Sequence, residues 1–248
     1  DMYLLKTIYL TMKKIKNTFT SSMITILIDN AYGLDTKGRM SPFIENIEGI
    51  PLNFLNGNRF CEWVFNRELA KSILVELQHQ GFTTRLVVNE RVDINLASRV
   101  KRINNICSQY GAKNVVLLSI GCGLDLNKDN WSDKKGWSFY VTDKRFENDL
   151  LGSCMMSHAI KYLGDSNVVK NNPYDMQECD HKGFLLKKVL CPSVATQNFF
   201  YTNESNLRYM VSEDGFQNLV KVHVDAVVDY AKSLKETKQD TLPLFSLV

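Results

Sequence analysis

The chain has 248 residues, of which 44% are hydrophobic and 23% charged, an ordinary composition for a globular protein. This length allows one large α/β domain with its own buried core. The formal net charge of +3 is small, and Lys and Arg form no dense patch with interleaved aromatics, which argues against a nucleic acid partner.

The cysteines and the N-terminus exclude further classes. The six cysteines are scattered and form no CxxC pair, so zinc-finger and thioredoxin motifs are absent. We expect buried free thiols, and the redox compartment stays open. No apolar run reaches the roughly 18 residues of a membrane span. The first residues do not resemble a signal peptide, because Lys13, Lys14 and Lys16 follow the apolar part and no small-residue cleavage site closes it.

Residues 3–19 carry apolar side chains at helical spacing, which predicts an amphipathic helix. We assign residues 1–22 to an N-terminal extension. Its helix either packs on its own domain or docks onto a partner or a membrane surface. The apolar run at 23–29 predicts a buried strand, and residues 41–58, rich in Asn, Gly and Pro, predict a loop.

After residue 60, segments with helical and strand-like patterns alternate. Helices are predicted at about 60–80, 94–111, 147–163, 205–211 and 215–236, and strands at 82–88, 114–121, 136–141 and 193–199. Residues 164–182 predict a surface loop. The alternation predicts an α/β fold, a mostly parallel sheet with helices on both faces. We expect this domain to span residues 23–236, with a C-terminal tail at 237–248.

Distinctive polar segments follow three of the predicted strands. They read "DNAYG" after the first strand, "SIGCG" after the third and "ATQNFFYTN" at the last, while "CEWVFNRE" begins the first helix after the loop. In α/β folds the carboxyl ends of neighbouring parallel strands meet at one edge, where ligands bind. These segments are therefore the candidates for a functional site.

Taken in order, these segments resemble the zinc-dependent N-acetylmuramoyl-L-alanine amidases, the peptidoglycan amidase family Amidase_3. The resemblance runs over about residues 23–235 and is nearest to forms from Bacteroides-like bacteria and their phages. It implies a zinc ion held by two His and one Glu with an open position for water, and a second Glu as general base. It also implies a setting in the cell envelope, the periplasm or a phage virion.

The chain departs from this family at the positions that carry the chemistry. The family's Gly-His-Gly corresponds to Tyr32 and its two neighbours, its Ser-Ile-His ends here in Gly121, and its Thr-Glu-Asn has Gln197 in place of Glu. Only Glu62 remains at a ligand position. A phenol, with a pKa of about 10, is a poor zinc ligand at neutral pH, and an amide cannot serve as a general base.

We therefore expect a pseudo-amidase without catalytic residues and without bound zinc, acting as a structural or binding module. Its expected partner is a protein or a larger assembly, contacted through residues 1–22, with peptidoglycan as a second candidate. Two alternatives stay open. One is an active amidase with relocated zinc ligands, for which Cys61 and Cys122 are the nearest soft donors. The other is a peptidoglycan-binding module with Trp63, Trp137 and Tyr140 lining its cleft.

Two expectations concern the remaining polar groups. The histidines at 79, 158, 181 and 223 are expected on helix faces or in loops away from the strand ends, in surface or structural roles. Without zinc, a buried Glu62 lacks its positive partner, which is costly. We expect the Tyr32 hydroxyl and the Gln197 amide to donate hydrogen bonds to this carboxylate, so that these residues form a neutral plug.

Overall fold

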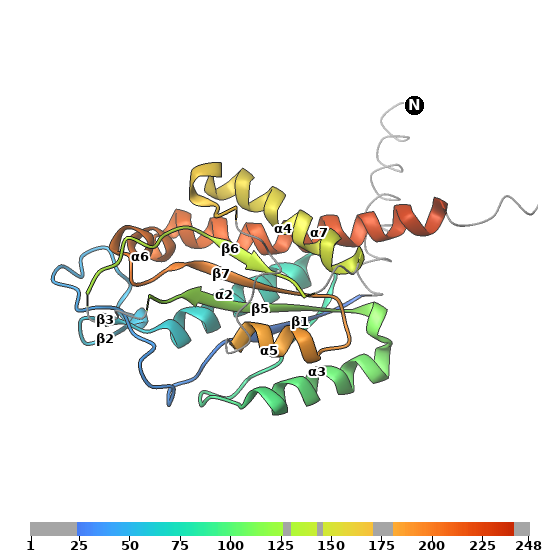
Figure 1. The fold of residues 1–248 in the computed structure, drawn as a ribbon, viewed down its shortest axis with the longest axis horizontal. Helices are drawn as coiled ribbons and strands as arrows, with labels where there is room; N and C mark the ends of the chain where they lie inside the picture. The colour runs from blue at the N-terminus through green and yellow to red at the C-terminus, as the bar shows by residue number, and fades with distance from the viewer. Residues whose placement is uncertain (1–23, 126–129, 143–145, 171–180, 241–248) are drawn as a thin grey trace, which may run out of the picture.

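The computed structural model describes residues 24–125, 130–142, 146–170 and 181–240 (Figure 1). Its centre is a five-stranded sheet in the order β4-β1-β5-β7-β6. The strands are β1 (Thr25–Asn30), β4 (Thr83–Leu86), β5 (Val115–Gly123), β6 (Ser138–Tyr140) and β7 (Ser193–Phe200). Only the edge strand β6 runs antiparallel to its neighbour. The predicted mostly parallel α/β sheet is confirmed.

Helices cover both faces of this sheet (Figure 1). They are α2 (Glu62–His79), α3 (Leu96–Tyr110), α4 (Phe146–Leu163), α5 (His181–Lys188), α6 (Glu204–Val211) and α7 (Glu213–Asp240). The helices α2, α4, α6 and α7 share one hydrophobic core with the sheet, and α3 and α5 share a second. In the described part of the chain, no helix combines the length and the apolar character needed to cross a membrane.

The strands β1 and β5 are apolar along most of their length because both of their faces are covered. Every residue of these two strands is buried. Side chains alternate between the two cores, so that Ile26 and Ile28 face α2 and α7 while Leu27 faces α3 and α5. Continuous apolar runs of this kind are typical of parallel sheets.

The predicted helix boundaries agree with the structure to within a few residues. Gly81 and Gly111 follow α2 and α3 with φ of 87° and 82°, conformations that glycine adopts without steric cost and that end helices. Two strands and one helix were missed. A short hairpin of β2 (Leu55–Asn56) and β3 (Arg59–Phe60) forms at the end of the predicted loop at 41–58 and just beyond it, and α5 begins at the end of the predicted loop at 164–182. The expected N-terminal helix at 1–22 lies outside the described residues.

Candidate functional site

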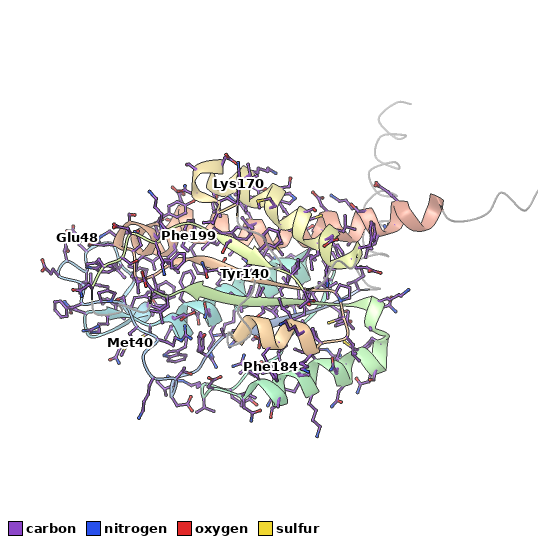
Figure 2. All side chains as sticks on the ribbon, in the orientation of Figure 1. Met40, Glu48, Tyr140, Lys170, Phe184 and Phe199 are labelled. Carbon is purple, nitrogen blue, oxygen red and sulfur yellow. The ribbon has the colours of Figure 1, made fainter. Side chains whose placement is uncertain are left out.

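The segments that follow the parallel strands meet at one edge of the sheet. Gly121 on β5 pairs in register with Gln197 on β7. The Ala31 amide beyond β1 donates a hydrogen bond of 3.0 Å to the carbonyl of Ile120 on β5, which brings Tyr32 to the same edge. These strand ends lie beside the β2–β3 hairpin and α6, at the end of the molecule where Figure 2 labels Met40 and Phe199. The backbone positions of Tyr32, Gly121 and Gln197 thus lie at the same edge of the sheet.

Glu62 is the first residue of α2 and is completely buried. Its Oε1 accepts hydrogen bonds from the Cys122 amide at 3.0 Å and from Asn66 Nδ2 at 3.4 Å. Its Oε2 lies 3.8 Å from Nη1 of Arg39. A helix N-terminus also favours a negative charge. The carboxylate is thus tied to β5, to its own helix and to a cation.

Arg39 is the component of this site that the sequence analysis missed. Its guanidinium carbon lies 4.0 Å from the centroid of the Tyr32 ring, a cation–π geometry. The Glu62 amide donates to the Arg39 carbonyl at 3.2 Å, and Met40 forms a β-bridge with Cys61. This backbone pairing fixes Arg39 beside the start of α2.

The electrostatics around Arg39 favour its charged form. Burial alone lowers the pKa of Arg39, but the attraction of Glu62, with contributions from Tyr32 and Tyr201, outweighs burial, and the pKa is raised. Tyr201 is completely buried; burial first, and then the charge of Glu62, raise the pKa of its phenol, which stays neutral. We call Tyr32, Arg39, Glu62 and Tyr201 the Arg39 cluster.

The Arg39 cluster corrects the predicted neutral plug. The structure puts a guanidinium beside the Glu62 carboxylate, so the charge of Glu62 is compensated by a cation. Gln197 takes no part in this cluster, because its side chain lines a separate pocket on β6 and β7. The sequence carried one signal that was not used: Arg39 is a basic residue in the loop that follows Tyr32.

The loop that carries Tyr32 is held in an unusual conformation. Tyr32 has a φ of 68°, in the left-handed region that few non-glycine residues adopt. Its carbonyl accepts a hydrogen bond of 2.9 Å from Arg67 Nη1. A Cβ on Gly33 would lie 2.1 Å from the Asp93 amide nitrogen, so only glycine allows this close approach. Backbone strain of this kind is concentrated at functional sites and persists where the surrounding structure imposes it.

A buried ion pair fixes the end of β1. Arg99 on α3 is fully buried, and its Nη1 lies 2.5 Å from Oδ1 of Asp29. The same Nη1 donates to the Asn30 carbonyl at 2.9 Å, and Nη2 lies 2.7 Å from Asp93. Because both charges of the Arg99–Asp29 pair are excluded from solvent, removal of either would leave a buried charge.

Gln197 is half-buried and lies in a pocket of about 210 Å³. Of the three aromatics proposed to line a glycan cleft, Tyr140 also lines this pocket. Trp137 is completely buried and donates from Nε1 to Asn198 at 3.0 Å, so its proposed place in a cleft is wrong. Trp63 is half-buried with the Arg67 guanidinium 5.2 Å from its ring.

The histidines have structural contacts. His223 is completely buried, with Nε2 2.9 Å from Thr196 Oγ1 on β7 and Nδ1 2.7 Å from the Leu219 carbonyl. Burial lowers the pKa of His223 to about 4, so the ring is neutral. His223 lies on α7 and contacts Thr196 in the middle of β7. His158 pairs with Asp229 at 2.9 Å, and His79 is exposed.

The two cysteines considered as relocated ligands are both buried. Cys61 precedes α2, and burial raises the pKa of its thiol. Cys122 Sγ lies 3.5 Å from Asn66 Oδ1, near Glu62. Within the described ranges, no group of three or more His, Cys, Asp or Glu side chains comes together in a way that could hold a metal ion.

Comparisons with known proteins agree with this architecture. The family model of N-acetylmuramoyl-L-alanine amidase, Amidase_3, matches residues 26–229. No curated protein sequence matches the chain significantly. Among solved structures, an N-acetylmuramoyl-L-alanine amidase from Clostridium difficile 630 superposes with a TM-score of 0.64 at 21% identity, covering 86% of this chain and 98% of that one.

Two further structures are equally similar in fold. The catalytic domain of CwlV, an N-acetylmuramoyl-L-alanine amidase from Bacillus (Paenibacillus) polymyxa var. colistinus, gives a TM-score of 0.62 at 17% identity, covering 85% and 99% of the two chains. The CwlD amidase of Clostridioides difficile, solved in complex with the GerS lipoprotein, gives a TM-score of 0.64 at 14% identity and covers 85% of this chain and 99% of that one. The family match spans most of the sequence, and the chain therefore belongs to the N-acetylmuramoyl-L-alanine amidase family, Amidase_3.

Proposed function

We propose that this chain is a non-catalytic member of the amidase family that acts as a binding module in the cell envelope, the periplasm or a phage particle. The observation that carries the proposal is the Arg39 cluster. The guanidinium lies 3.8 Å from Glu62 and 4.0 Å from the Tyr32 ring centroid. A permanent cation thus accompanies the one carboxylate that remains at a ligand position.

The residues at the family's ligand positions do not fit a zinc ion. They offer one carboxylate, one phenol and a glycine, while catalytic zinc sites use three strong protein ligands. A zinc ion bound to Glu62 would also be repelled by the adjacent guanidinium, since like charges in a site shielded from water repel strongly. At the general-base position, the Gln197 amide cannot accept a proton. We derive no hydrolytic step from this arrangement.

The preserved scaffold supports a binding role. The Arg99–Asp29 pair and the Arg67 hydrogen bond hold the strand-end loops in place through contacts within the chain. The CwlD amidase, solved in complex with a lipoprotein, has the same fold and is an example of an amidase that associates with another protein. We propose a protein partner for this chain, with peptidoglycan as the alternative ligand.

One observation favours the alternative of an active enzyme with relocated ligands. Cys122 Sγ lies 3.5 Å from Oδ1 of Asn66, whose Nδ2 donates to Glu62, so the thiol lies near the carboxylate. A thiolate with one carboxylate would still need a third ligand, and the described residues bring none together with them.

Incubation of the purified chain with muropeptides and with intact peptidoglycan, with and without added zinc, tests the proposal. An active amidase of the same family serves as the positive control. We expect no release of stem peptides above the no-enzyme background under either condition. Peptide release that a chelator abolishes and zinc restores would overturn the proposal.

A further inference from the structure

The pocket beside Gln197 has the properties of an anion site. It lies where β6 and β7 pair, on the side of the sheet that carries α3 and α5, and has a volume of about 210 Å³. Its lining consists of Lys134, Lys135, Ser138, Tyr140, Val169, Gln197 and Phe200. The volume suits a small ligand or the end of a larger one.

Two hydrogen-bonding side chains of this pocket have no partner among the residues that the structure describes. Ser138 is 2% exposed, and its Oγ makes no hydrogen bond with any of these residues. Ser138 pairs in register with Gln197, so both side chains project from the same face of the sheet. Within the described ranges, the Gln197 amide also makes no hydrogen bond. Buried polar groups are nearly always satisfied, so an orphaned hydroxyl here indicates a ligand or an ordered water.

The charge of the pocket is positive. Lys134 is partly compensated by Asp125, with 3.4 Å between Nζ and Oδ1. Lys135 forms no ion pair with any residue that the structure describes. The lysine-bearing loop is anchored, because Ser132 Oγ donates to Asp125 at 2.7 Å and Asn203 donates to the Ser132 carbonyl at 2.8 Å. The lysines are therefore presented from a fixed backbone.

The residue at position 197 decides which ligand this pocket accepts. A glutamate, as in the family motif, would add a negative charge and repel an anion. The amide of Gln197 is neutral and supplies N–H donors. The same substitution that removes the general base therefore makes the pocket suitable for a negative group.

We propose that this pocket binds a carboxylate-bearing ligand. The Gln197 amide and the Ser138 hydroxyl donate to the carboxylate oxygens, and Lys135 supplies the opposite charge. Tyr140 and Phe200 pack against the adjoining apolar part of the ligand. This inference rests on the proposed binding role and names the chemical class that is bound. The carboxylate comes either from the end of a peptide or from a small free acid.

The test uses the full chain in metal-free buffer with three probes: N-acetyl-alanyl-alanine, its C-terminal amide, and acetate. Binding is followed by the NMR shifts of the backbone amides of Ser138 and Tyr140, which line the pocket and are present in every variant. We expect the free acid to bind and the amide to bind at least about tenfold more weakly, because a hydrogen bond to a charged group is lost. Acetate binding as tightly as the peptide would assign the site to small acids. Equal binding of peptide acid and peptide amide would overturn the proposal.

Variants separate the site from general charge effects. Q197E should weaken binding of the peptide acid at least about tenfold and K135Q by roughly threefold to tenfold, with a reduced salt dependence for K135Q. The matched control is K113Q, an exposed lysine in the turn before β5 at the other end of the sheet, which should leave affinity unchanged. Unchanged affinity in a folded Q197E protein would refute the site. Amidase turnover by the parent chain would overturn the proposed function and leave this binding result standing.

Discussion

The two halves of the strand-end site differ in how their polar groups are satisfied. Around Glu62, the carboxylate is buried and compensated by Arg39, two hydrogen-bond donors and a helix N-terminus. Around Gln197, Ser138 Oγ has no hydrogen-bond partner among the described residues and lines an open pocket. Two neighbouring parts of one sheet edge thus differ in how their polar groups are compensated. In the half around Glu62, which we call the closed half, the charge is compensated by residues of the chain itself. In the half around Gln197, the open half, hydrogen-bond donors line a pocket, and a ligand is therefore expected there.

The largest expected effect is on the closed half. R39M removes the guanidinium and keeps much of its volume, leaving Glu62 as a buried charge without its cation. We expect a loss of about 2–4 kcal/mol in the free energy of unfolding, below the usual cost of breaking a fully buried pair because Arg39 is 28% exposed. Urea denaturation measures it, and R39M/E62Q should regain most of the loss. A free energy of unfolding of R39M within about 0.5 kcal/mol of the parent value would contradict the role of Arg39 in compensating Glu62.

A second effect concerns His223 on α7, which packs against β7 next to the strand residue Gln197. His223 is buried and neutral against Thr196, with its pKa lowered to about 4 from an ordinary value near 6.5. As the pH falls below about 6.5, His223 takes up a proton in the unfolded chain but stays neutral in the folded chain, which favours unfolding. The stability that neutral His223 allows is therefore fully present above about pH 6.5 and is lost as the pH falls toward 4. Between pH 7 and pH 5 the loss is about 2 kcal/mol.

Chemical denaturation at a series of pH values measures this loss. H223Q keeps a hydrogen-bonding side chain but cannot take up a proton, and its stability should fall by about 2 kcal/mol less than that of the parent over the same interval. Parallel pH profiles for the two proteins would show that His223 does not titrate as described.

A smaller effect is expected at Tyr32. Y32L removes the ring below the Arg39 guanidinium while it keeps an apolar side chain. The cation–π contact of a partly exposed arginine contributes about 1 kcal/mol, so the free energy of unfolding should fall by about that amount. In the R39M background, Y32L should cost less, and a double-mutant cycle measures the difference. Additive effects of the two substitutions would mean that the ring and the guanidinium do not interact.

The smallest effect is expected from Q197E. Gln197 is half-buried in the open pocket and has no hydrogen bond with a described residue, so the substitution should change thermal stability by less than about 0.5 kcal/mol. In the closed half, loss of a charge in R39M should lower the free energy of unfolding, whereas in the open half, gain of a charge in Q197E should leave it nearly unchanged. Destabilisation of Q197E similar to that of R39M would remove the distinction between the halves.

Much of the fold could be predicted because its signals are local. The apolar runs of β1 and β5 and the glycines at 81 and 111 each act within a few residues of the chain. The short α5 helix was missed because eight residues containing a glycine give little helical periodicity, and its Leu185 and Leu186 are buried only through contact with the second core.

The site was predicted in position and only partly in chemistry. The order of motifs identified Tyr32, Glu62, Gly121 and Gln197, which the structure brings to one edge of the sheet. Arg39 was not identified, because its place depends on the pairing of Met40 with Cys61 across 20 intervening residues of loop and hairpin. The contact of His223 with Thr196 could not be predicted for a similar reason, because it joins α7 to β7 across 27 positions of the chain.

Zinc titration by calorimetry tests most directly whether Arg39 takes the place of a metal. Three metal-free proteins are compared: the parent chain, the variant Y32H/G121H/Q197E that restores the family residues, and the same variant with R39M added. We predict no stoichiometric zinc binding by the parent, and at least about tenfold tighter binding once Arg39 is removed from the restored variant, since a like charge beside the site is relieved. Tight binding of one zinc by the parent, or equal affinities of the two variants, would contradict the role of Arg39.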